Sequence, residues 1–208
     1  PAIRSVMADL LKESLKDCTA SQQEAIQHTK GPLLVLAGAG SGKTRVITRR
    51  IAYLIGSGAD PRNIMAITFT NKAAGEMAER VAALGAPQGA WVATFHATCA
   101  RLLRMYGDKL GYTSDYTIYD TADTLTAVRQ AMKDLDIDAK EWRPSRVAGA
   151  ISNAKNAMRT PEDVMSEGFR GETVGKVFLR YEELLVSRNA MDFDDLLLRA
   201  VQLLREHE

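Results

Sequence analysis

The sequence predicts an α/β fold, in which a parallel sheet is flanked by helices and carries an inserted, all-helical subdomain. Apolar runs alternate with helical patterns through the first half of the chain. Each run is continuously apolar, which is typical of parallel strands covered on both faces by helices. From about Thr113 only helical spacing remains, and this change predicts the helical subdomain.

Three pairs of a strand and a helix form the predicted α/β part. They are expected at 33–36 with 44–55, 64–69 with 72–84, and 91–94 with 96–105. Gly56-Ser57-Gly58 ends the first pair and Gly85-Ala86-Pro87 ends the second, because glycine and proline interrupt helices. A further helix is expected to open at Ser21, before the first strand.

The helical region begins after a short β-like run at 116–119. Asp120 follows this run and is a good N-cap for the next helix. Ser152, Lys155 and Arg159 share a polar helix face, the usual mark of a solvated surface. Two apolar stripes and a last amphipathic helix recur at helical spacing and should face the core. They are Val147, Ile151, Ala154 and Met158; Val174, Val177, Phe178, Tyr181 and Leu184; and Phe193, Leu196, Leu197, Ala200, Val201 and Leu204.

The composition indicates a folded protein without membrane segments. The 208 residues are 46% hydrophobic, and no apolar run approaches the roughly 20 residues of a membrane span. The N-terminus lacks the order of a secretory signal, so a cytoplasmic location is expected. Cys18 and Cys99 lack metal-ligand spacing and are expected to be reduced packing residues. The net charge of +1 neither requires nor excludes nucleic acid.

A glycine-rich segment joins the first expected strand to its helix and predicts a phosphate-binding loop. It fits the pattern G-x-x-x-x-G-K-[ST], with alanine in the first glycine position. Backbone N–H groups of such a loop converge on phosphate oxygens, and the helix that follows directs its positive dipole end to the same anion. The lysine adds a positive charge, and the threonine hydroxyl is placed to ligate Mg²⁺. The predicted phosphate site is Ala37, Gly38, Ala39, Gly40, Ser41, Gly42, Lys43 and Thr44, of which Lys43 and Thr44 are the catalytic candidates and Thr44 the metal ligand.

Several further segments stand at strand ends or helix starts, where an open α/β sheet places its ligands. They are Ser21-Gln22-Gln23-Glu24-Ala25-Ile26, Lys43-Thr44-Arg45, Ile67-Thr68-Phe69-Thr70-Asn71-Lys72-Ala73-Ala74, Thr94-Phe95-His96 and Met191-Asp192-Phe193-Asp194-Asp195-Leu196. Together with the phosphate loop, these segments resemble the superfamily 1A DNA helicases of the UvrD/Rep/PcrA type. The resemblance covers essentially the whole chain but only the N-terminal part of the family's length.

The resemblance implies a site for ATP and Mg²⁺. Gln22 falls on the family's adenine-reading glutamine, whose amide can donate and accept at once. Arg45 matches the arginine thought to lie against the adenine ring, although an exposed helix arginine is an equal alternative. The family has an asparagine where this chain has Thr19, and no cap role is expected of Thr19.

The resemblance also implies contact with single-stranded DNA through six residues. Aromatic rings can stack on bases of any sequence, and polar groups can hold the sugar and phosphate backbone. The simpler alternatives are a core position for Phe69 and Phe193, an N-cap role for Asn71 and a structural histidine. The aspartates near Phe193 are better explained by a helix N-terminus than by metal binding. The implied residues are Phe69, Asn71, Lys72, Thr94, His96 and Phe193.

The resemblance further implies the N-terminal part of a 3′–5′ DNA helicase of repair or replication type. It places a RecA-like P-loop NTPase subdomain at 1–114 plus 191–208 and a helical subdomain at 115–190. The sequence stops before the Walker B strand and its Asp-Glu pair, so hardly any hydrolysis is expected from residues 1–208 alone. In the full-length protein, single-stranded and junction DNA and the remaining helicase domains in cis are the expected partners.

Two other function classes remain open from the sequence. One is a non-catalytic module that binds nucleotide or docks a protein partner. The other, a small-molecule kinase, is the weaker alternative, because Gln22 and the segments at 68–72 and 94–96 have no role in it.

Overall fold

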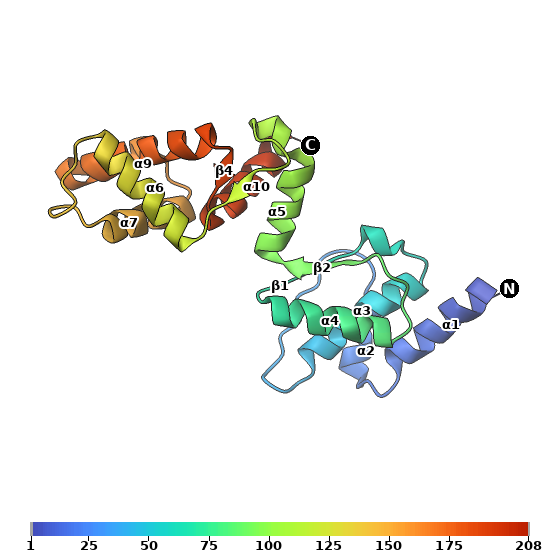
Figure 1. Cartoon of the computed structure of the whole chain (residues 1–208). Coiled ribbons are helices and arrows are strands. Elements are labelled where there is room, and N and C mark those ends of the chain that lie inside the picture. Colours follow the sequence, from blue (N-terminus) through green and yellow to red (C-terminus); the bar gives the residue numbers. More distant parts are fainter. Residues whose placement is uncertain (1, 208) are drawn as a thin grey trace. The chain divides into compact units, whose positions relative to one another are not determined.

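The chain forms a mixed α/β structure that is mostly helical and contains small parallel sheets (Figure 1). The computed structural model describes residues 2–207, with side chains from Ser5 onward. Two compact units, Pro1–Phe95 and His96–Glu208, divide the chain. Among the helices of the described residues, none is long and apolar enough to cross a membrane.

The first unit consists of four helices, a short 3₁₀ helix and one pair of strands. Its elements are α1 (Ala2–Leu15), α2 (Ala20–Gln27), α3 (Lys43–Gly56), η1 (Pro61–Asn63), β1 (Met65–Thr68), α4 (Asn71–Ala83) and β2 (Trp91–Thr94). These bounds confirm the predicted second and third strands and the helices after the first two expected strands. The strands pair in parallel, with Met65 opposite Trp91 and Thr68 opposite Thr94, as the sequence predicts.

The sequence predicts helices on both faces of the sheet, and this prediction is wrong for β1. Ala66 is buried, whereas Met65 and Ile67 on the opposite face are exposed. Because successive strand residues point to opposite faces, the helices of this unit cover only one side of β1.

The predicted strand at 33–36 is also wrong, because this segment takes no regular structure. Its side chains lie in solvent, with Leu34 81% and Leu36 86% exposed. A strand needs a neighbour to bond its backbone N–H and C=O groups. No strand in the described residues pairs with this segment, so its apolar composition alone did not produce a strand.

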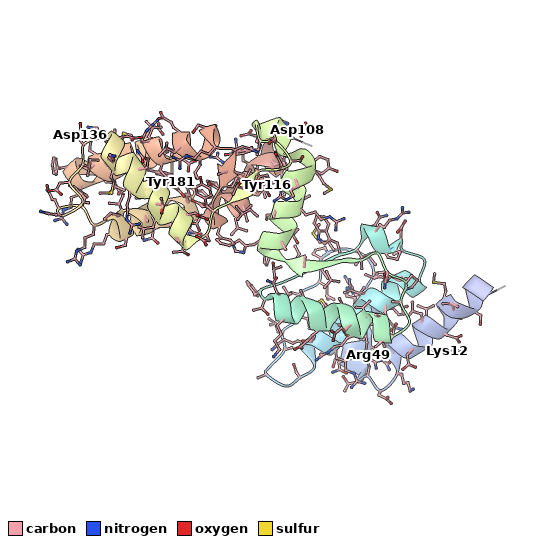
Figure 2. All side chains as sticks on the ribbon, viewed as in Figure 1. Lys12, Arg49, Asp108, Tyr116, Asp136 and Tyr181 are labelled. Atoms are coloured by element: carbon pink, nitrogen blue, oxygen red, sulfur yellow. The ribbon has the colours of Figure 1, made fainter. Side chains whose placement is uncertain are left out.

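The core of the first unit lies between α3 and its neighbours. Leu10 of α1 packs with Ile51, Ala52 and Ile55 of α3 and with Met77 of α4. Helix α1 was not among the predicted elements. Its C-terminal carbonyls are held by Arg49 of α3 (labelled in Figure 2), whose Nη1 donates to the oxygens of Glu13 and Lys16 at 2.6 and 2.8 Å. A positive charge at a helix C-terminus also interacts favourably with the helix dipole.

The second unit is built from helices with one short strand pair. Its elements are α5 (Phe95–Tyr106), η2 (Gly107–Leu110), β3 (Thr117–Ile118), α6 (Thr121–Asp134), α7 (Pro144–Asn156), α8 (Pro161–Met165), α9 (Gly168–Ser187), β4 (Ala190–Met191) and α10 (Phe193–Glu206). Helices α6, α7 and α9 pack against one another (Figure 1). The predicted helical character after 113 is confirmed.

The strand pair β3–β4 brings distant parts of the second unit together. Thr117 lies opposite Ala190 and Ile118 opposite Met191, in parallel. Asp120 caps α6 as predicted, accepting from the N–H groups of Ala122 and Asp123. The chain therefore enters the packed helices α6, α7 and α9 beside the point where it leaves them.

The core of the second unit contains most of the predicted apolar positions, but Met158, Phe193 and Leu204 are exposed. Val147, Ile151, Val177 and Phe178 are buried. Met158 is instead half exposed with a φ of 56°, because α7 ends at Asn156 and the chain turns there. Both cysteines are free and partly buried against apolar clusters, which confirms their predicted packing role.

Candidate functional site

The phosphate-loop segment borders a cavity of about 680 Å³ in the first unit. Thr19, Ser21 and Gln22 line it from the start of α2. The segment before α3 contributes Leu33, Val35, Leu36, Ala37, Gly38 and Ser41. One face of α3 completes the wall. That face consists of Lys43, Val46, Ile47 and Arg50, which recur at helical spacing. The cavity thus has two cations and no acidic residue among its described lining residues.

Two glycines give the loop its shape. Gly40 and Gly42 have φ angles of 77° and 86°, in the left-handed region that disfavours side chains. Gly42 is the N-cap of α3 and makes no side-chain cap bond. A Cβ atom built on Gly42 would lie 3.1 Å from the Nε2 atom of Gln22. The loop and the glutamine are therefore in close contact at the helix start.

Replacing Gly42 by alanine should destabilise the first unit by about 1–2 kcal/mol, the usual cost of a left-handed alanine. Gln22 would also have to move away from the new methyl group. Gly75 in α4 is the matched control, because its Cβ would meet nothing within 4 Å and its φ is ordinary. Urea unfolding should give a lower midpoint for Gly42→Ala and none of that loss for Gly75→Ala. Equal midpoints would contradict the strain at Gly42.

Lys43 is held by the loop itself. Its Nζ atom donates to the carbonyl oxygens of Ala37 and Gly38, both at 3.0 Å. An ammonium has three hydrogens, so one remains for a further acceptor. Thr44 follows in the first turn of α3 and is exposed. Ser41 closes the loop through its hydroxyl, which donates to Gly38 at 2.7 Å.

Gln22 lies at the cavity in a defined orientation. Its Oε1 accepts from the Thr19 N–H, and its Nε2 donates to the Ser41 oxygen, both at 3.1 Å. Thr19 in turn is the N-cap of α2 and forms a capping box with Gln22. The expectation that Thr19 has no cap role was therefore wrong, since threonine caps a helix as asparagine does. One N–H and one lone pair of the Gln22 amide remain for a ligand.

Two arginines of α3, Arg45 and Arg50, line different cavities. Arg45 lines a different cavity, of about 300 Å³, and its Nη2 donates to the Lys16 oxygen at 3.4 Å. Arg50 lines the phosphate-loop cavity and donates to the Ala25 oxygen at 2.7 Å. Arg50 was not among the predicted site residues. Its position seven residues after Lys43, two helical turns along the same face, was the available signal.

The first unit also presents an exposed pair of aromatic rings at the ends of its strands. Phe69, after β1, is 89% exposed, which excludes the core alternative. Its ring centroid lies 5.7 Å from that of Phe95, after β2. Phe95 was not among the predicted site residues, although it stands between two of them in the sequence.

The polar residues beside the first ring pair differ in exposure. Asn71 and Lys72 are exposed, and their side chains bond no other described residue. Thr70, rather than Asn71, is the N-cap of α4, because its hydroxyl accepts from the Ala73 N–H. Thr94 is buried within β2.

A second ring pair lies in the second unit. The rings of His96 and Phe193 meet edge to face with centroids 5.9 Å apart. His96 is exposed and Phe193 is 51% exposed, so Phe193 is not a core residue. Each unit therefore offers one accessible pair of rings, and their members Phe95 and His96 are adjacent in the sequence.

Comparison with known proteins decides the family. Residues 18–208 match the family described as UvrD/REP helicase N-terminal domain. The chain belongs to this family. It is 44% identical over 194 residues to the ATP-dependent DNA helicase PcrA of Staphylococcus epidermidis (strain RP62A), and 43% identical to that of Staphylococcus aureus (strain Mu50). Each match covers 91% of this chain, which spans about 27% of the relatives' length.

In this UvrD/REP domain, Asp192 and Asp195 belong to a buried ion cluster. Lys155, expected on a solvated face, is fully buried, and that expectation was wrong. Its Nζ lies 2.8 Å from Asp192 Oδ2, 2.8 Å from Asp195 Oδ1 and 2.7 Å from Glu182 Oε1. The contact with Glu182 is an ion pair without hydrogen-bond geometry. Asp192 is the N-cap of α10, as the helix-start interpretation of this segment predicts.

Three carboxylates surround one ammonium in this cluster, and this excess of negative charge affects the pKa values of its members. Burial raises the pKa of Asp195 to about 7, and the charges of Glu182 and Asp192 add to this, against the attraction of Lys155. Burial also disfavours the charged form of Asp192. The attraction of Lys155 is stronger than this effect and lowers the pKa of that carboxyl. The three carboxylates likewise overcome the effect of burial on Lys155 and raise its pKa.

Between about pH 4 and 7, Asp195 should make the UvrD/REP domain less stable as the pH rises. Its pKa is about 7 when folded and 3.8 in the reference state, so the folded form binds more protons in this window. The slope is at most about 1.4 kcal/mol per pH unit for one proton. The shifts of Asp192 and Lys155 act outside the window. The free energy of unfolding is measured with urea at several pH values, and for Asp195→Asn it should not show this slope. A pH dependence equal to that of the wild type would contradict the prediction.

Proposed function

We propose that the chain is the N-terminal ATP-binding and single-stranded-DNA-contacting part of an ATP-dependent 3′–5′ DNA helicase or translocase. The observation that carries the proposal is the cavity beside the phosphate loop, with Lys43, Arg50 and Gln22 in its wall. A cavity with two cations suits a polyphosphate, and its volume lies within the usual range for small-molecule sites. The family membership supports the same reading.

In this proposal the loop binds the phosphates of ATP. Backbone N–H groups of 38–44 and the free hydrogen of Lys43 would hold phosphate oxygens, and the Thr44 hydroxyl would ligate Mg²⁺. The Gln22 amide keeps one donor and one acceptor for adenine. Arg45, which donates to α1 through Lys16, would have to reorient to reach the base. The bound Mg²⁺ would neutralise phosphate charge.

Single-stranded DNA is the second ligand in the proposal. The ring pairs Phe69–Phe95 and His96–Phe193 are accessible, and base–aromatic stacking tolerates any sequence. Asn71 and Lys72 supply free donors for the DNA backbone next to the first pair. Thr94 is expected to contribute less to DNA binding, because it is buried.

We also propose the division into a RecA-like subdomain at 1–114 plus 191–208 and a helical subdomain at 115–190. Its support is the junction near 115 and 190. There β3 pairs with β4, and the Thr113 N–H donates to the Asn189 Oδ1 at 3.1 Å. An insertion whose two ends meet in this way leaves the surrounding fold continuous.

Residues 1–208 alone should bind ATP and turn it over hardly at all. Phosphoryl transfer depends on positioning and charge stabilisation, and a carboxylate must orient the attacking water. In the proposal, the Asp-Glu pair of the helicase supplies that carboxylate, and the remaining helicase domains act in cis.

The proposal is tested by titrating the 208-residue chain with a fluorescent ATP analogue and Mg²⁺, and by measuring phosphate release with and without a poly(dT) oligonucleotide. Saturable binding that ATP reverses, with phosphate release near background, is expected. The absence of nucleotide binding would refute the proposed site. Binding of nucleotide without any binding of the oligonucleotide would favour a non-catalytic nucleotide-binding module instead. Robust phosphate release would overturn the claim of low turnover.

A further inference from the structure

The first turn of α10 is held from one side by two neighbouring residues of α7. Lys155 contacts Asp192 and Asp195 at 2.8 Å each, and Asn156 Nδ2 donates to Asp194 Oδ1 at 3.0 Å. The acidic residues next to Phe193 in the sequence, Asp192, Asp194 and Asp195, are therefore all bonded to α7. The Phe193 side chain itself is half exposed and meets the His96 ring.

Each aspartate of the capping box divides its two oxygens between α10 and α7. Asp192 accepts the Asp195 N–H through Oδ1 and Lys155 through Oδ2. Asp195 accepts the Asp192 N–H through Oδ2 and Lys155 through Oδ1. The cap geometry and the lysine therefore depend on each other. Tyr181 adds a hydrogen bond of 2.7 Å to Asp192 Oδ2.

We propose that Lys155 is a positioning residue: by holding Asp192 and Asp195, it sets the first turn of α10 and thereby the place of the Phe193 ring against His96. The meaning of this ring pair as a DNA contact rests on the proposed function. The geometric claim does not. Lys155 contacts both members of the capping box, the N-cap Asp192 and Asp195 in the first turn of α10.

A charge-matched variant separates positioning from folding. At pH 8, above the pKa of Asp195, Lys155→Gln combined with Asp195→Asn removes one positive and one negative charge, so the net charge of the cluster is unchanged. Breaking a buried pair by removing one partner alone would leave an uncompensated charge. Lys155→Arg is the conservative variant, and Lys176→Gln on α9 is the control, because it removes an exposed ion pair with Glu172.

The readout is the NMR signal of the His96 ring, which the Phe193 ring current displaces. The chain has three histidines, so the spectrum is simple to assign. Phe193→Leu defines the His96 signal without the ring. In the double variant, the His96 signal should move toward that reference while the His28 signal stays, and Lys155→Arg should restore most of the wild-type position. A folded double variant with a wild-type His96 signal would overturn the proposal.

Two further measurements keep the test decisive. If the double variant does not fold, Asp195→Asn alone should give a smaller shift in the same direction, and a wild-type signal there counts against the proposal. The affinity for labelled poly(dT) should fall in the double variant by at most the share of one stacked base, roughly fivefold to a hundredfold. If the wild type binds no DNA but the His96 signal moves as expected, the proposed function fails and the positioning role stands.

Discussion

Replacing Lys43 by alanine is expected to weaken the binding of Mg²⁺-ATP roughly tenfold to a hundredfold. A hydrogen bond between charged groups contributes about 1.5–3 kcal/mol, and Lys43 is the cation that the loop itself holds. The fold should survive the change. The Lys43 side chain is exposed, and among the described residues it donates to Ala37 and Gly38.

Competitive titration with a fluorescent nucleotide measures this loss of affinity. Lys12→Ala is the matched control, since Lys12 is an exposed lysine of α1 in the same unit (labelled in Figure 2) and does not line the cavity. The control should bind as the wild type does. Equal affinities for Lys43→Ala and the wild type would remove the phosphate loop from the proposed site.

Replacing Phe69 by alanine is expected to weaken single-stranded DNA binding about fivefold to a hundredfold. One base stacked on an aromatic side chain contributes roughly 1–3 kcal/mol. Little core packing is lost, because the ring is 89% exposed and its recorded ring partner is Phe95. The thermal midpoint should therefore stay close to that of the wild type.

The anisotropy of a labelled poly(dT) oligonucleotide checks the expected loss. Phe169→Ala is the control, because Phe169 is also a largely exposed phenylalanine but lies at the start of α9. DNA affinity that falls equally in both variants would point to a general effect of surface aromatics. Affinity that falls in neither would exclude Phe69 from the DNA contact.

Local rules predicted the parts of the fold that local residues determine. Asp120 caps its helix because a carboxylate can accept backbone N–H groups wherever a helix begins. The pairing of β1 with β2 followed from the alternation of strands and helices, which requires parallel neighbours. Gly40 and Gly42 of the loop likewise took left-handed conformations, whereas Gly38 did not.

Two of the failed predictions concern features that depend on distant partners. The segment 33–36 has the composition of a strand, but a ladder needs a second strand, and no described strand supplies one. Lys155 occupies a polar helix position, yet three carboxylates from α9, β4–α10 and α10 make its burial possible. A sequence pattern read along one helix cannot indicate charges that another segment will supply.

The location of bound nucleotide tests the central claim most directly. The 208-residue chain is irradiated with 8-azido-ATP in the presence of Mg²⁺, and the labelled peptides are mapped by mass spectrometry. The structure predicts labels that ATP suppresses, confined to the cavity wall between Thr19 and Arg50. Labels elsewhere in the chain, or labels that excess ATP does not reduce, would contradict the account.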